Sequence, residues 1–239
     1  MKEKINTHRK TAIIVGVLYI IGTVAGVLSV VLSTPILDGP DFLTKVSSNE
    51  AQFVTASLFI LLMGLALAMV PFLLFPIFKK VNEVLAVGYV VFRGALETVT
   101  YIASVIIFLF MLVIGRQYVA AGTPSASNLL TLGSVLKEGK DFLPPIMGIV
   151  FSLGALMLYY VFYKSRLIPR WISGWGFIAI LLHLASSFLI MFNLQTAFSA
   201  SNMIMNSQIF FQEMVMAVWL IVKGFNPSAI ASLPSRNSD

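Results

Sequence analysis

Four ionisable side chains stand inside long apolar stretches of this sequence, and they are its best candidates for chemistry. They are Arg93, Glu97, His183 and Glu213. Where such a stretch crosses a lipid bilayer, each charged group costs about 2.5–3.5 kcal/mol on insertion scales, so its retention needs a reason. Two reasons are open: a buried hydrogen-bonded contact between helices, or a site that binds a ligand or a proton.

Glu213 is the strongest of these candidates. The apolar segment that contains it must reach back to about residue 203 to cross a hydrocarbon core of ~30 Å at 1.5 Å per residue, which places Glu213 near the midplane. Asn202 and Asn206 share its helical face, and Gln212 is its polar neighbour in the chain. Such a face is expected to point toward protein or water. It indicates either a carboxyl group that locks helix packing or an anchor for a ligand or proton.

His183 lies near the middle of its own apolar segment, with Ser186 and Ser187 on the same helical face. One interpretation is a neutral, hydrogen-bonded core residue. The other is a proton-sensitive partner for Glu213, because histidine titrates near physiological pH.

Arg93 and Glu97 are spaced i,i+4, so on a helix they can form an ion pair directly. Tyr101 extends the same face by one more turn, and Ser152 on a later segment is a further polar group expected to face the bundle. The depth of Arg93 is open. If the helix enters the membrane near Val84, Arg93 lies at mid-depth beside His183 and Glu213, and an Arg93–Glu213 or Arg93–Glu97 pair would offset most of the burial cost. If most of the span begins later, Arg93 reaches back to the surface.

The composition identifies the class of protein. Hydrophobic residues make up 58% of the 239 residues and charged residues only 11%, whereas soluble domains carry about 45–50% and 25%. An ordinary soluble enzyme is excluded. We predict an all-α, polytopic membrane bundle, with one domain over residues 1–225 and a flexible tail over 226–239. Six apolar segments are long enough to cross a bilayer, namely about 11–32, 52–78, 82–114, 142–163, 171–192 and 203–223.

The lysines and arginines predict the orientation. With six spans, eleven of the 16 basic residues fall on the side of the N-terminus and four on the other side. Because cytoplasmic loops carry the excess of Lys and Arg, both termini are predicted to be cytoplasmic. The longest outer loop is predicted at about 115–141, with a short interfacial helix near Leu129–Lys137.

Several chemistries lack their sequence signature. The chain has no cysteine and two histidines, so we expect no metal site and no cofactor. It has no phosphate-binding loop, no HExxH and no GxSxG motif, and we name no catalytic residue. No basic and aromatic face lies outside the membrane, so nucleic acid is not an expected partner.

The chain resembles a known family over nearly its whole length. It is similar to the bacterial membrane proteins catalogued as domain of unknown function 4386, and its most specific segment is the turn Ile168-Pro169-Arg170-Trp171. The resemblance implies a multi-pass protein of a bacterial cell membrane and supplies no activity. The segments that carry it include Arg9-Lys10-Thr11-Ala12, Leu18-Tyr19-Ile20, Val24-Ala25-Gly26, Asn49-Glu50, Lys80-Val81-Asn82-Glu83, Phe92-Arg93-Gly94-Ala95-Leu96-Glu97, Tyr163 to Trp171, Phe211-Gln212-Glu213 and Trp219 to Gly224.

Three functions are compatible with these residues. The first is binding or transport of a small lipophilic or cationic molecule, with Glu213 as anchor or proton carrier and Arg93, Glu97 and His183 setting its charge. The second is a structural or regulatory membrane subunit, in which the turn Arg166–Trp171 docks a membrane protein partner or a second copy. The third is an intramembrane enzyme acting on lipid through Glu213 and His183, which no motif supports. The lipid bilayer is a partner in all three.

Overall fold

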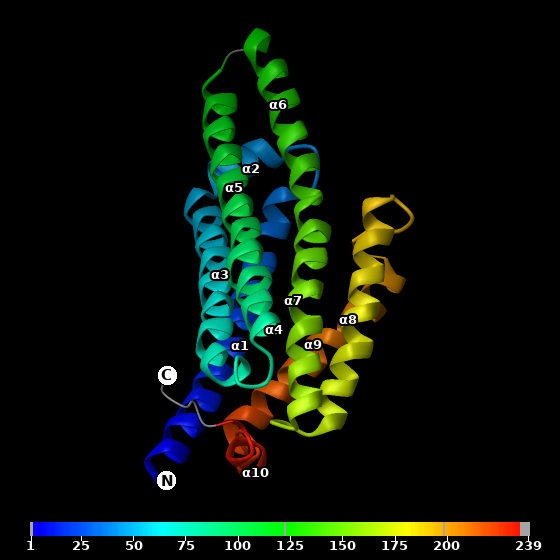
Figure 1. Ribbon diagram of the computed structural model, residues 1–239. Helices are drawn as coiled ribbons and strands as arrows, with labels where there is room; N and C mark the ends of the chain where they lie inside the picture. Colours follow the sequence, from blue (N-terminus) through cyan, green and yellow to red (C-terminus); the bar gives the residue numbers. More distant parts are fainter. Residues whose placement is uncertain (1, 122, 198, 235–239) are drawn as a thin grey trace.

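The computed structural model describes residues 2–121, 123–197 and 199–234, and within these ranges every regular element is a helix (Figure 1). Six helical stretches in this part of the chain are long and apolar enough to cross a membrane, which confirms the predicted number. They are Thr7–Leu37, Glu50–Phe78, Glu83–Ala120, Ala126–Ser165, Arg170–Met191 and Ala200–Val222.

The individual elements follow one another with short connections. They are α1 (Lys2–Leu37), α2 (Phe42–Ser48), α3 (Glu50–Phe78), α4 (Glu83–Tyr89), η1 (Val90–Leu96), α5 (Glu97–Ala120), α6 (Thr123–Asp141), α7 (Leu143–Ser165), α8 (Arg170–Met191), α9 (Ala200–Val222) and α10 (Pro227–Ala231). The third span is α4, η1 and α5 in one continuous rod, and η1 is a π-helical turn.

The spans are arranged as a closed ring. Contacts join α1 to α3, α3 to α5, α5 to α7, α7 to α8, α8 to α9, and α9 back to α1. Small residues allow the closest approaches: a methyl group on Gly22 would lie 2.8 Å from Leu67, and one on Gly64 would lie 2.9 Å from Tyr101. Such contacts are how helices pack tightly in lipid, where hydrophobic burial gives little drive.

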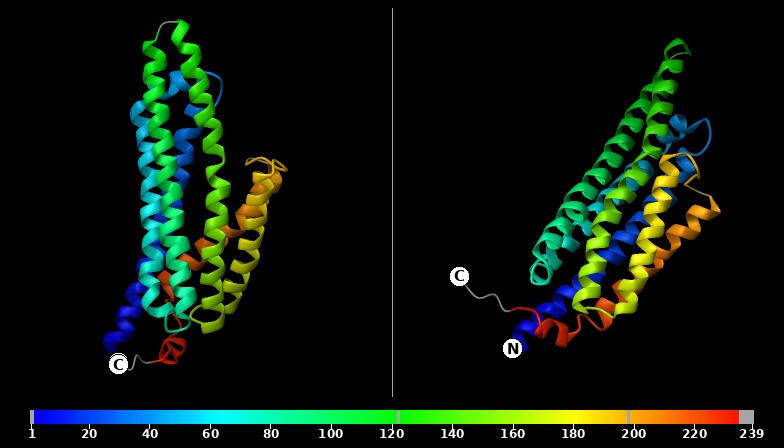
Figure 2. Two further views of the ribbon diagram at one scale, coloured as in Figure 1. Left: turned by 45° about the horizontal axis from the view of Figure 1, so that its top comes forward. Right: turned by 45° about the vertical axis from the view of Figure 1, so that its right-hand side comes forward.

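The two ends of the ring differ in charge. We call the end that carries the α3–α4 turn, the α7–α8 turn and α10 the basic end, because Lys79, Lys80, Arg166, Arg170 and Lys223 lie there. The start of α1 lies at the same end (Figure 1). At the opposite end, the hairpin of α5 and α6 extends beyond the other helices in every view (Figure 2). By the distribution of Lys and Arg, the basic end is the one predicted to be cytoplasmic.

The segment at about 115–141, predicted as a loop with a short helix near Leu129–Lys137, is helical over most of its length. α5 continues to Ala120 and α6 is helical from Thr123 to Asp141. The reason is an apolar stripe: Leu129 and Leu136 pack against the core, and a methyl group on Gly133 would lie 2.9 Å from Leu43 of α2. The hairpin therefore gains helix packing that the Ser- and Thr-rich composition did not indicate.

The segment predicted as a flexible tail begins with the short helix α10. Ala229 is buried, and the backbone N–H of Asn226 donates to the carbonyl of Leu167 at 2.8 Å. Residues 235–239 of the predicted tail lie outside the described residues.

Arg9 fastens the first span to the last. Its guanidinium donates to the carbonyls of Leu220 at 3.0 Å, Ile221 at 2.6 Å and Val222 at 3.0 Å. These carbonyls are the unpaired acceptors at the negative end of α9, where a cation is favourable.

We expect Arg9→Ala to lower the melting temperature of the detergent-purified protein. Three carbonyls lose a charged donor, at a cost of about 1–3 kcal/mol, which corresponds to roughly 3–10 °C for a chain of this size. Lys10→Ala is the matched control, because Lys10 is exposed and adjacent in the chain. Equal melting temperatures for the two variants would show that the Arg9 contacts contribute nothing.

Candidate functional site

Three of the four ionisable residues meet inside the ring. The guanidinium of Arg93 donates from Nη1 to both carboxylate oxygens of Glu97, at 2.8 and 2.9 Å. Its Nη2 donates to Oε1 of Glu213 at 3.4 Å. We call Arg93, Glu97 and Glu213 the charge cluster. It joins the third span to α9, 120 residues further along the chain.

The charge cluster is deeply buried. The exposed fractions of the side chains are 3% for Arg93, 1% for Glu97 and 15% for Glu213. The helix that carries Arg93 begins at α4, where the side chain of Asn82 accepts the N–H of Leu85 at 3.0 Å and caps the helix. Arg93 lies ten residues beyond Glu83, which at 1.5 Å per residue is about 15 Å along the helix. This position is compatible with the deeper of the two depths considered from the sequence, and the depth in the membrane stays a prediction.

The π-helical turn η1 presents Arg93 to the centre of the ring. π-turns inserted in α-helices are rare in proteins overall, and those that occur are often found at functional sites. Gly154 of α7 lies directly against this turn, because a methyl group there would be 3.1 Å from the backbone nitrogen of Arg93. The absence of a side chain at residue 154 therefore allows α7 to approach the widened backbone.

Aromatic rings surround the guanidinium. The Cζ of Arg93 lies 4.4 Å from the ring centroid of Phe151 and 5.9 Å from that of Tyr19, within the range of cation–π attraction. Tyr101 donates its hydroxyl to Oε1 of Glu97 at 3.0 Å. The Nε of Arg93 is buried and has no hydrogen-bond partner in the described part of the chain.

The charge cluster holds one more carboxylate than cation. Among the described residues, no other lysine or arginine forms an ion pair with Glu97 or Glu213. With all three groups ionised, the net charge is therefore negative in a region of low dielectric constant, where an uncompensated charge is costly. A proton or a bound cation is what balances such a cluster.

His183 belongs to a separate polar network nearer the α6 end. Its Nδ1 is 2.6 Å from Oδ1 of Asn206, and the amide of Asn206 donates to Asn202 at 2.6 Å. Asn202 also accepts a hydrogen bond from Ser186. In the described part of the chain His183 makes no hydrogen bond to Glu213, so the structure does not bring together the pair that the sequence suggested.

Phe151 lies between His183 and the charge cluster. Its ring meets the imidazole of His183 edge to face, with centroids 5.2 Å apart, and the same ring lies beside Arg93. The depth of His183 was inferred from its place in the segment, but the direction of its side chain depends on how α7 and α8 pack, which no local pattern encodes.

The four further polar residues predicted for the site are distributed between the charge cluster, the His183 network and other contacts. Tyr101 joins the charge cluster and Asn206 joins the His183 network. Gln212 accepts from Tyr159 at 2.5 Å and donates to the carbonyl of Ile172 at 3.0 Å, so it ties α9 to α7 and α8. Ser152 donates within its own helix, to Gly148 at 2.6 Å.

An aromatic layer that was not predicted from the sequence lies on the basic-end side of the cluster. Tyr19 and Tyr89 have their hydroxyl oxygens 3.4 Å apart, and Phe78 lies between Tyr89 and Phe162, with ring centroids at 5.8 and 5.1 Å. All four side chains are buried. We call them the aromatic seal. Tyr89 stands one helical turn before Arg93, which was the available signal.

On the other side, a cavity of about 410 Å³ leads from the α6 end toward the cluster. It lies between α1, α3, α5, α6 and α7, and Tyr101 forms part of its wall. The cavity thus touches the residue whose hydroxyl is bonded to Glu97. Its other lining residues are Ser29, Val30, Ser33, Thr34, Leu37, Asp38, Ile60, Met63, Ser104, Phe108, Lys137, Lys140, Asp141, Pro144, Met147 and Ala197.

The chain matches one family among the known protein families. The model of the domain of unknown function DUF4386 matches residues 14–224. The chain belongs to the DUF4386 family. No curated protein and no solved structure matches it. Membership in DUF4386 and the six apolar helices together make it a multi-pass integral membrane protein. The family description assigns no activity, so the geometry of the cluster and cavity carries the functional argument.

Proposed function

We propose that the protein binds a small lipophilic cation that enters from the α6 end, with the charge cluster as its counter-charge, and that this binding serves transport across a bacterial cell membrane. The observation that carries the proposal is a cavity that reaches Tyr101, the hydrogen-bond partner of a buried cluster with one carboxylate in excess.

The walls of the cavity support a lipophilic ligand. Ile60, Met63, Phe108 and Met147 line it, and methionine adapts to ligands of irregular shape because its thioether chain is flexible and polarisable. A volume of about 410 Å³ lies within the range of small-molecule sites, which typically combine apolar walls with a few placed polar groups.

The charge balance supports a positive ligand. At the mouth of the cavity, Asp38 and Asp141 are matched by Lys137 and Lys140, so the mouth has no net charge. The imbalance lies deeper, at Glu97 and Glu213. A cation near Tyr101 would neutralise that excess. An anion there would add to it.

The aromatic seal supports transport rather than simple binding. The cavity is open toward the α6 end, while Tyr19, Phe78, Tyr89 and Phe162 close the ring between the cluster and the basic end. A transporter needs such a one-sided state, with the binding site near the bilayer midplane.

Two probes of opposite charge and nearly equal shape test the proposal. Tetraphenylphosphonium is a lipophilic cation and tetraphenylborate is the corresponding anion. With the full chain in lipid nanodiscs, we expect saturable binding of the cation and none of the anion, measured by equilibrium dialysis. Equal partitioning of both, unchanged by protein, would contradict the proposal and favour a structural subunit in which the cluster only fixes helix packing.

A further inference from the structure

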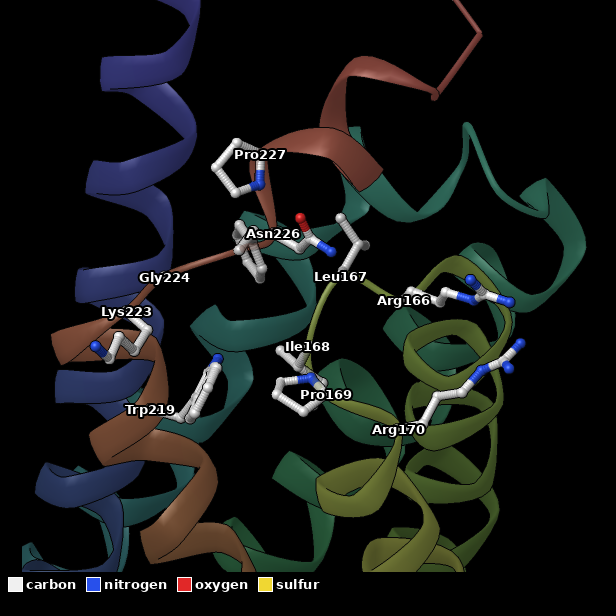
Figure 3. Close-up of a pocket in the computed structure, with 11 residues that line it drawn as sticks. Arg166, Leu167, Ile168, Pro169, Arg170, Trp219, Lys223, Gly224, Asn226 and Pro227 are labelled. Atoms are coloured by element: carbon white, nitrogen blue, oxygen red, sulfur yellow. The ribbon is translucent and has the colours of Figure 1, made fainter.

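A second cavity, of about 630 Å³, lies at the basic end, between the α7–α8 turn and the segment that follows α9 (Figure 3). It is separate from the cavity that reaches Tyr101, since the two share no lining residue. The turn Ile168-Pro169-Arg170-Trp171, the most specific segment of the family resemblance, contributes to its wall. Its lining residues are Arg166, Leu167, Ile168, Pro169, Arg170, Trp219, Lys223, Gly224, Phe225, Asn226 and Pro227.

The cavity has an apolar floor and a basic rim. Figure 3 shows Ile168, Pro169 and Trp219 around the hollow, while the side chains of Arg166 and Arg170 extend outward side by side on one flank and the side chain of Lys223 extends outward on the opposite flank. The guanidinium of Arg170 also lies 5.0 Å from the ring centroid of Tyr163. The lining contains no acidic residue. Within the part of the chain that the structure describes, none of the three cations is ion-paired with a carboxylate.

The backbone that holds the cavity is fixed from both sides. Arg166 ends α7 in the left-handed conformation, at φ 58°, a position where glycine is the usual and less strained residue. The hydrogen bond from Asn226 N–H to the carbonyl of Leu167, at 2.8 Å, ties the two walls together. An arginine occupies this left-handed position, so the turn carries a cationic side chain where glycine would carry none.

The location matches the headgroup layer of a membrane. The cavity lies where α7 and α9 end and α8 begins, and Trp171, next to its wall, is 57% exposed. Exposed tryptophan at the end of a span is typical of the membrane interface. The basic end is the one predicted to face the cytoplasm, where the leaflet carries anionic lipids that attract lysine and arginine.

We propose that this cavity is a binding site for an anionic phospholipid of the cytoplasmic leaflet. Its phosphate lies at the basic rim, and its glycerol backbone and upper acyl chain lie on the floor formed by Ile168, Pro169 and Trp219. The same chemistry would recognise a soluble phosphate ester. The apolar floor and the interfacial position favour the lipid.

The test uses Trp219 as the reporter inside the site. A background with Trp171→Phe and Trp175→Phe leaves Trp219 as the remaining tryptophan, since the chain has three. The protein is placed in nanodiscs of phosphatidylcholine that contain a small fraction of phosphatidylglycerol brominated on its acyl chains. We expect quenching of Trp219 to exceed the value for the same fraction of brominated phosphatidylcholine, which shows enrichment of the anionic lipid beside it.

The charge variants decide whether the enrichment is specific. Arg166→Gln with Arg170→Gln is expected to reduce the enrichment by about fivefold for each charge removed. Lys79→Gln with Lys80→Gln removes the same charge from the other basic turn, outside the cavity, and is expected to leave it unchanged. Equal losses in both variants would overturn the proposal, because they would show a diffuse attraction of lipid to a basic surface.

Soluble competitors separate the two sources of phosphate. Glycerol 3-phosphate and inorganic phosphate, at millimolar concentrations, are expected to leave the lipid quenching of Trp219 unchanged. Displacement by either compound would overturn the assignment to a lipid and reassign the cavity to a soluble phosphate ester. Quenching by brominated phosphatidylcholine alone, equal in all variants, shows that each is folded in the bilayer.

Discussion

Replacing Arg93 with Gln is expected to prevent most of the protein from folding. The substitution leaves Glu97 and Glu213 buried without their shared cation, and within the described ranges the Tyr101 hydroxyl is the one further side-chain donor to Glu97. Removing one partner of a buried ion pair costs about 3–5 kcal/mol, a large part of the 5–15 kcal/mol that stabilises a typical domain. The measurement is the yield of monodisperse protein after extraction into mild detergent.

A compensating variant separates charge from shape. Glu97→Gln in the Arg93→Gln background removes one of the stranded carboxylates and is expected to restore much of the yield. Arg93→Lys keeps the charge but has one nitrogen in place of the two through which Arg93 contacts Glu97 and Glu213, so an intermediate yield is expected. If Arg93→Gln alone accumulates like the unsubstituted protein, the cluster is not a buried ion network.

Replacing Glu213 with Gln is expected to have the opposite pattern: a large loss of function and little loss of stability. The contact of Glu213 with Arg93 is the longer one, at 3.4 Å, and its side chain is the most exposed of the three, at 15%. Replacing the Glu213 carboxylate with an amide removes the surplus negative charge of the charge cluster. Affinity for tetraphenylphosphonium is expected to fall by about thirtyfold or more, since losing one partner of a desolvated charge pair costs about 2–5 kcal/mol.

The matched control is Glu138→Gln, the same substitution at an exposed residue of α6. It removes one negative charge from the chain but none from the interior, so binding of the cation should be unchanged. Glu97→Gln is expected to weaken both binding and folding, because Glu97 holds Arg93 and Tyr101 together. Retention of cation affinity in Glu213→Gln would remove Glu213 from the proposed site.

Local patterns predicted part of the site and long-range packing determined the rest. The pairing of Arg93 with Glu97 follows from an i,i+4 spacing, which any continuous helix preserves. The approach of Glu213 to Arg93 follows from the closed ring, in which α9 packs between α1 and α8. The polar face of α9 indicated an inward direction, and an Arg93–Glu213 pair was one of the two pairs predicted if Arg93 lay at mid-depth. Similarly, His183 lies inside its span, but Phe151 stands between it and Arg93.

Of two further structural features, one was not predicted from the sequence and the other was predicted only in part. The π-turn at residues 90–96 widens a helix whose residues would fit an ordinary α-helix, and its counterpart is Gly154, a single glycine in another span. Of α6, only the part near Leu129–Lys137 was predicted as a helix, because the start of α6 is rich in Ser and Thr. Its stabilising contacts are to α2 and α5, which only the folded chain provides. The number of spans depends on hydropathy alone and was therefore predictable, whereas the fourth helical stretch begins at Ala126 and not near residue 142.

The most direct test is to locate the cation itself. Tetraphenylarsonium has nearly the shape of tetraphenylphosphonium, and its arsenic atom scatters anomalously, so a crystal of the protein with this cation gives its position. The account predicts a single arsenic peak inside the cavity between α1, α3, α5 and α7, next to Tyr101, and its loss in Glu213→Gln. A peak only on the lipid-facing surface, or no peak at a saturating concentration, would contradict it.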